Sequence, residues 1–127
     1  MNQDDDIPTI PEEVVDYLRK LRKRERQLLY KKKFLKTRFL DMGDRLKLLQ
    51  GRNEDLPCMV SAKNVYQLST VRLVRENLVS MLSATSEDYV KCYLELSLVQ
   101  RSLSEDLQTI RRNLEQDQMQ TNSIEQN

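Results

Sequence analysis

A chain of 127 residues is long enough for one domain, and its formal net charge at pH 7 is only +1. Hydrophobic residues make up 39% and charged residues 32%, with two glycines, three prolines and no tryptophan, which is typical of a helical protein. The absence of histidine removes the usual general base near neutral pH and the commonest metal ligand. We therefore expect a protein that is not an enzyme, with no catalytic residues, cofactor, metal site or small-molecule substrate.

The first predicted element is a helix over about residues 10–50. A T-x-x-E capping box at 9–12 marks its start. From 14 to 49, positions that alternate in steps of four and three are mostly Val, Leu, Phe or Met, which is a heptad pattern. Gly51 follows the last of these positions, as a C-terminal helix cap would.

Residues 51–60 are predicted to be a connector, because Pro57 breaks the helical pattern there. Beyond Pro57 the chain has no glycine or proline, and a second heptad pattern runs over 65–114. We expect this part to be helical over about 61–116. It would form either one helix or two helices that meet at 84–86, where Thr85 or Ser86 would cap the second.

The predicted fold class is all-α. Long helices would form a coiled-coil helical hairpin, or an elongated three-helix bundle if the chain breaks near 84–86. A single helical coiled-coil domain is expected over 9–118. It would lie between a flexible acidic lead at 1–8 and a disordered tail at 119–127.

The expected hairpin also predicts an interface. With a midpoint near residue 55, residue i faces about 111 minus i, so that the second helix extends past the start of the first. Its apolar seam there would have no partner within the chain, and we expect it to bind its own copy or another coiled-coil protein. The predicted partner-helix residues are Tyr93, Leu96, Leu103, Leu107, Ile110 and Leu114.

The stretch RKLRKRERQLLYKKKFLKTRFL, residues 19–40, holds eleven lysines and arginines against one acid, Glu25. Most charge pairs at helical spacing within it are repulsive, each costing about 0.2–0.5 kcal/mol. The expected hairpin supplies too few facing acids, so we predict a negative surface on another molecule. The predicted binding residues are Arg19, Lys20, Arg22, Lys23, Arg24, Arg26, Lys31, Lys32, Lys33, Lys36 and Arg38.

Three negative surfaces remain open at this point. The first is an acidic protein or the chain's own acidic lead, and the second is nucleic acid or chromatin, held through phosphate contacts without base readout. An anionic membrane surface ranks third. A membrane-surface helix has a wide apolar face, whereas here basic side chains surround the helix except at the seam.

The cysteines and the opening residues bear on the compartment. Cys58 and Cys92 belong to neither a CxxC pair nor a zinc spacing, so we expect ordinary thiols in a reducing compartment. The acidic opening MNQDDD lacks the basic and apolar regions of a secretory signal, and no apolar run approaches the roughly 20 residues of a membrane span. We expect an intracellular protein, nuclear or cytoplasmic.

Together these patterns predict a non-enzymatic structural or adaptor subunit of a multi-protein intracellular assembly. It would bind partner helices through Leu/Val heptad seams and an acidic surface through its basic helix face. The alternative is a nucleic-acid or chromatin-binding factor that uses the basic helix 19–38.

Overall fold

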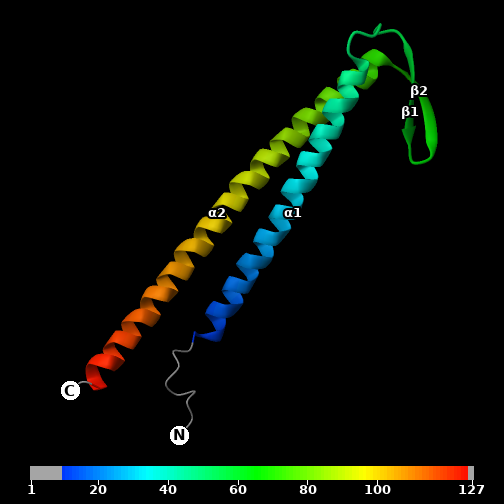
Figure 1. Ribbon diagram of the computed structural model, residues 1–127. Coiled ribbons are helices and arrows are strands. Elements are labelled where there is room, and N and C mark those ends of the chain that lie inside the picture. The colour runs from blue at the N-terminus through cyan, green and yellow to red at the C-terminus, as the bar shows by residue number, and fades with distance from the viewer. Residues whose placement is uncertain (1–9, 126–127) are drawn as a thin grey trace. The chain divides into compact units, whose positions relative to one another are not determined.

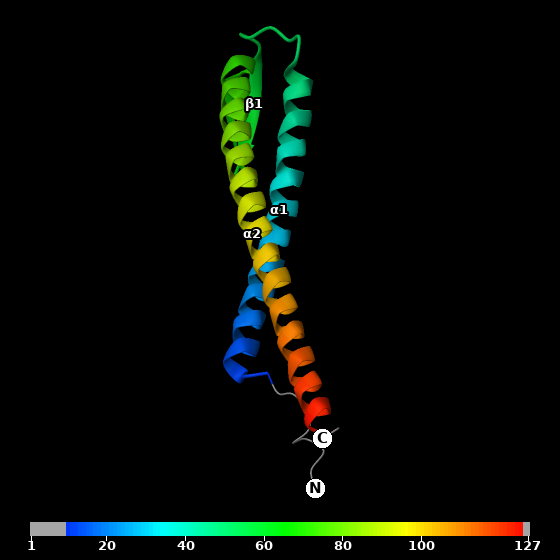
Figure 2. The same ribbon diagram turned by 90° about the vertical axis from the view of Figure 1, so that its left-hand side faces the viewer.

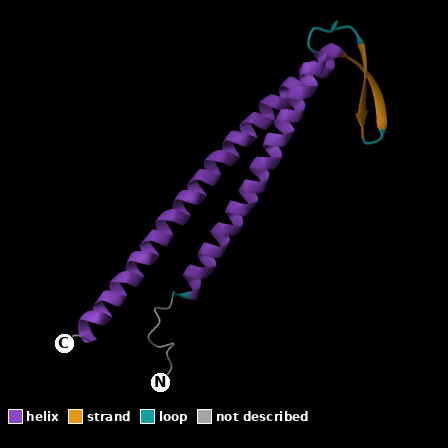
Figure 3. Cartoon of the chain, viewed as in Figure 1, coloured by secondary structure: helices purple, strands orange, loops and turns teal. Residues whose placement is uncertain are grey.

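The computed structural model describes residues 10–125, and side chains over residues 10–120. In chain order the elements are helix α1 (Glu12–Leu49), strand β1 (Pro57–Ala62), strand β2 (Val65–Thr70) and helix α2 (Val71–Glu125) (Figures 1 and 3). The described residues divide into two units. Unit 1 contains the residues up to Leu29 and from Leu94 onward, and unit 2 is Tyr30–Tyr93.

The prediction of an all-α fold was wrong, because β1 and β2 form a two-stranded antiparallel sheet. Lys63 and Asn64 join the strands with φ angles of 50° and 66°. Positive φ at both central residues defines the type I′ turn, whose twist matches that of a hairpin. The sequence misled here because Val65 and Leu68 also fit a heptad spacing, so that the first part of the predicted second helix is a hairpin.

Helix α2 is uninterrupted, which rules out the alternative of a three-helix bundle. Thr85, expected as a possible cap at a helix break, is buried inside α2. The helix begins at Val71, later than predicted, where the Thr70 hydroxyl accepts a 3.3 Å hydrogen bond from the Leu73 amide. It continues to Glu125, through residues for which the sequence predicted a disordered tail.

Helix α1 lies close to its predicted span. Its first turn carries Glu12 and Glu13, and the Pro11 carbonyl accepts hydrogen bonds from the Val14 and Val15 amides at 3.0 and 3.2 Å. After Leu49 the helix ends, and Gly51 has a φ of 76°, the left-handed conformation that glycine adopts at helix ends. The predicted acidic lead and the capping threonine lie outside the described residues.

Unit 1 pairs the first part of α1 with the second part of α2 in antiparallel directions. The Arg24 Nε donates a 2.8 Å hydrogen bond to Glu95, whereas the predicted register would place Arg24 beside about residue 87. The register differs because the hairpin lengthens the connection and shifts its midpoint toward residue 60. Leu96 and Leu103 are buried in this unit, so the expectation that they lack a partner within the chain was wrong.

Unit 2 pairs the second part of α1 with the first part of α2, again antiparallel. The Arg75 guanidinium donates to the Leu49 carbonyl at 3.0 Å, and the Lys32 ammonium lies 5.1 Å from the centroid of the Tyr93 ring. The buried residues of unit 2 recur every seven residues along each helix: Leu35 and Met42 in α1, and Val71, Leu78, Thr85 and Cys92 in α2. Each of the four in α2 lies one residue before a position of the predicted heptad seam.

Tyr17 in unit 1 provides a test of the helix pairing. A hydrogen bond to Asp106 raises the pKa of Tyr17 above its ordinary value of 10.0, and burial and the charge of Asp106 act in the same direction. The folded chain therefore holds this proton more tightly than the unfolded chain. The resulting stabilisation is complete below pH 10 and is lost as the pH rises through the folded-state pKa.

We expect Tyr17→Phe to remove a tyrosinate absorbance transition centred above pH 10 in the folded protein. The stability difference between wild type and this variant should shrink in the same pH range. Asp106→Asn should move the transition back toward pH 10, because it removes the negative acceptor. A Tyr17 transition at or below pH 10 would contradict the contact with Asp106.

Candidate interface at the hairpin and along α1

One face of the hairpin is apolar and exposed. Residues paired across an antiparallel sheet point to the same side, and Met59 pairs with Leu68 while Tyr66 lies diagonally next to them. The three side chains are 65%, 75% and 69% exposed respectively. A surface hairpin usually turns its apolar face inward and its polar face outward, so this arrangement leaves an apolar surface open to a partner.

The opposite face of the hairpin is less exposed at two positions of β1. Cys58 and Val60 on this face are half-buried. Figures 1 and 2 show the hairpin beside the adjoining ends of α1 and α2. A hollow of 660 Å³ there is lined by residues of all four elements, among them Val60, Leu68 and Leu78. The helices therefore support the hairpin without enclosing it.

The hairpin also has open edges. The sheet contains only β1 and β2, so neither strand has a second neighbouring strand among the described residues. Outward amide and carbonyl groups at such an edge can pair with a strand from another chain. A two-stranded hairpin alone is only marginally stable in water, which favours completion of the sheet by additional strands.

Arg75 joins the start of α2 to the end of α1 and to the connector that precedes the hairpin. Its guanidinium donates to the Leu49 carbonyl at 3.0 Å and to Glu54 at 3.3 Å, while the Val71 amide donates to the Leu56 carbonyl at 3.0 Å. These bonds satisfy a carbonyl at the C-terminal end of α1 and fix where α2 starts.

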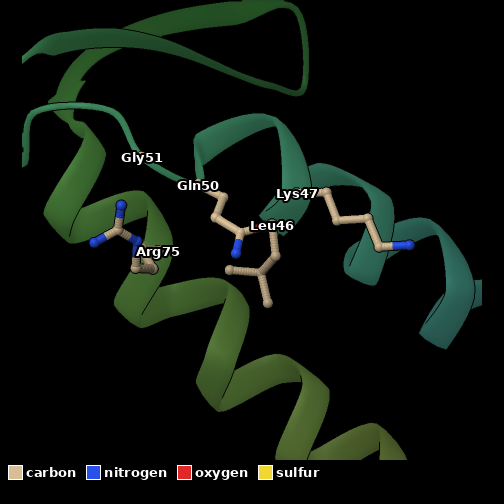
Figure 4. Close-up of a pocket in the computed structure, with 5 residues that line it drawn as sticks. All are labelled: Leu46, Lys47, Gln50, Gly51 and Arg75. Atoms are coloured by element: carbon tan, nitrogen blue, oxygen red, sulfur yellow. The ribbon is translucent and has the colours of Figure 1, made fainter.

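A hollow of 380 Å³ lies beside Arg75 (Figure 4). Leu46 and Gln50 extend toward α2 there, and Lys47 points away from Arg75. The Arg75 guanidinium that borders this hollow is bonded to Leu49 and Glu54, so it holds the connector between α1 and the hairpin in place.

The predicted basic residues line α1 through both units, and all but Lys32 are exposed. Arg19 lies 3.9 Å from Asp16, Arg22 lies 3.2 Å from Glu25, and Arg24 pairs with Glu95. The others form no ion pair with any described residue: Lys20, Lys23, Arg26, Lys31, Lys32, Lys33, Lys36 and Arg38. The excess of positive charge predicted from the sequence is thus only partly neutralised by the described part of the chain.

The predicted partner-helix residues do not form one exposed surface. Leu96 and Leu103 are buried, Ile110 and Leu114 are half-buried, and only Tyr93 and Leu107 are exposed. Tyr93 also contacts Lys32 through its ring. The hairpin, which the sequence analysis missed, exposes more apolar surface in one place. Its signals were the alternation of Tyr66 and Leu68 with polar Gln67 and Ser69, and an asparagine at a two-residue turn.

The chain matches no model of a known protein family and no curated protein. Over the described residues, no helix contains a stretch long and apolar enough to cross a membrane. No group of three or more acidic or cysteine side chains in the same part of the chain is arranged to hold a metal ion. The hairpin and the charge on α1 are the features of the described residues that bear on function.

Proposed function

We propose that this chain is a non-enzymatic structural or adaptor subunit of an intracellular protein assembly, and that it joins a partner chain through the β1–β2 hairpin. The supporting observation is the exposed apolar face of Met59, Tyr66 and Leu68 on a sheet with open edges. A strand of the partner would extend the sheet by backbone hydrogen bonds and cover these three side chains. This proposal replaces the free helical seam as the principal contact, because Leu96 and Leu103 are buried.

Two further features support an assembly role inside the cell. Cys58 and Cys92 are not joined in a disulfide, which suits the reducing cytoplasm or nucleus. The paired helices in each unit leave few buried side chains for their length, and partner contacts would add burial to such a fold.

The test compares Met59→Asp/Leu68→Asp with the wild-type chain, purified under mild conditions from its native cells together with any associated proteins. Light scattering after size exclusion should give wild type a molar mass above 15.1 kDa and the hairpin variant the mass of a monomer. Val79→Asp/Leu98→Asp is the matched control, because both side chains are exposed on α2 outside the hairpin. Helical circular dichroism should be the same for all three proteins.

Three outcomes would contradict the proposal. They are a wild-type monomer of 15.1 kDa, a hairpin variant that keeps the wild-type mass, and loss of assembly only in the α2 control. The last result would place the interface on helix α2 instead of the hairpin.

A second candidate function, nucleic-acid or chromatin binding, is favoured by the unpaired cations of α1 such as Lys23 and Lys33. Charge reversal at Arg22, Lys23, Lys32 and Lys33 separates the two functions. Loss of nucleic-acid retention with the assembly intact would favour the second, because phosphate contacts depend on these charges and hairpin contacts do not.

A further inference from the structure

A groove runs along the start of α1 in unit 1. It has a volume of 520 Å³ and is lined by Val15, Leu18, Arg19, Arg22, Lys23 and Arg26. The four basic positions follow the spacing i, i+3, i+4 and i+7, which places them on one face of the helix over two turns. We call Arg19, Arg22, Lys23 and Arg26 the cationic groove residues.

The cationic groove residues have capacity for acceptors beyond their own chain. Arg19 and Arg22 contact Asp16 and Glu25, yet their side chains remain 78% and 53% exposed. Lys23 and Arg26 form no ion pair with any residue that the structure describes. Each of the four also lies three or four residues from another cation, so an anion in the groove would relieve repulsion among them.

The apolar and acidic side chains in and beside the groove favour one class of anionic ligand over another. Val15 and Leu18 add half-buried apolar side chains to its lining. Toward the start of the helix the charge changes sign, because Glu12 lies on the same face two turns before Arg19 and Asp16 lies one turn before it. A nucleic-acid strand, which is negative along its whole length, would meet these acids and would leave the apolar side chains uncovered.

From this arrangement we infer that the groove binds a short acidic segment of a partner protein that also carries apolar side chains. Its carboxylates would accept charge-assisted hydrogen bonds from the cationic groove residues, and an apolar side chain would cover Val15 and Leu18. The surface lies on α1 and does not involve the hairpin, so the two contacts are separable.

The test uses fluorescence anisotropy at physiological salt with the purified full chain. The probe is a labelled synthetic peptide of Glu, Asp and Leu residues, with leucine at i, i+3, i+4 and i+7. Arg19→Glu/Arg26→Glu should weaken binding at least tenfold, because it reverses two of the cations in the groove. Lys33→Glu/Arg38→Glu changes the net charge equally outside the groove and should bind within about threefold of wild type.

A changed peptide and the hairpin variant provide two further comparisons of binding. Replacement of the peptide leucines by serine should weaken binding at least fivefold, since it removes the contact with the apolar side chains. Met59→Asp/Leu68→Asp should bind the peptide like wild type, so a failure of the hairpin proposal leaves this result unaffected. Circular dichroism checks that each variant keeps its helices.

Four results would overturn the inference. They are equal weakening by both pairs of charge reversals, equal binding of the serine peptide, tighter binding of a duplex DNA of the same charge, and binding that appears only after residues 1–9 are deleted. The first two indicate a diffuse electrostatic attraction, the third assigns the groove to nucleic acid, and the fourth assigns it to the chain's own acidic lead.

Discussion

Replacing Leu28 by alanine is expected to lower the free energy of unfolding by about 2–5 kcal/mol, the range found when a buried leucine is truncated. Leu28 is 1% exposed and is one of the two largest fully buried side chains among the described residues. The change removes three carbons from a packed site and leaves a cavity that neighbouring helices only partly refill.

Leu29→Ala is the matched control, because the same atoms are removed one residue away at a side chain that is 45% exposed. The two substitutions gain the same helix propensity, so the difference between them isolates burial. We expect Leu29→Ala to cost less than about 1 kcal/mol in urea denaturation followed by circular dichroism. Equal losses at the two positions would contradict the orientation of α1.

Proline at position 84 is the second change with a large expected effect. Ala84 is exposed and lies well inside α2, so its replacement tests the backbone and leaves the core intact. Proline removes a helical hydrogen bond and clashes with the preceding turn, at a cost of about 3 kcal/mol or more. Ala84→Gly keeps the hydrogen bond and should cost only about 1 kcal/mol.

The proline variant separates the continuous helix from the three-helix alternative. With a helix break at 84–86, proline would lie just before a helix start and would be tolerated. Urea denaturation that shows a loss below about 1 kcal/mol for Ala84→Pro would therefore argue against an uninterrupted α2. Ala84→Gly is the reference for the loss in unfolding free energy, because its cost depends only on residue 84 being inside a helix.

Much of α1 could be predicted from its sequence because its signals are local. Acidic residues open the helix and Gly51 follows its end, and both act on backbone groups within a few residues. The apolar residues of α1 also fall mainly on one line, so Leu28, Leu35 and Met42 were predicted to lie in the seam and are buried.

The buried face of α2 was harder to predict. Its apolar residues lie on two adjacent lines, one through Leu78 and Cys92 and the other through Val79 and Tyr93. Both lines share the positions of Leu96 and Leu103, so spacing alone does not distinguish them. The register of α1 against α2 buries Leu78 and Cys92 of the first line and leaves Val79 and Tyr93 of the second exposed.

By itself, the sequence determined that the chain is mostly helical, where α1 lies and that α1 carries excess positive charge. Only the tertiary structure decided that 57–70 is a hairpin, that α2 is continuous and which apolar residues stay exposed. The reason is physical. Caps and charge pairs act over one or two helical turns, whereas strand pairing and side-chain burial depend on contacts between residues far apart in the chain.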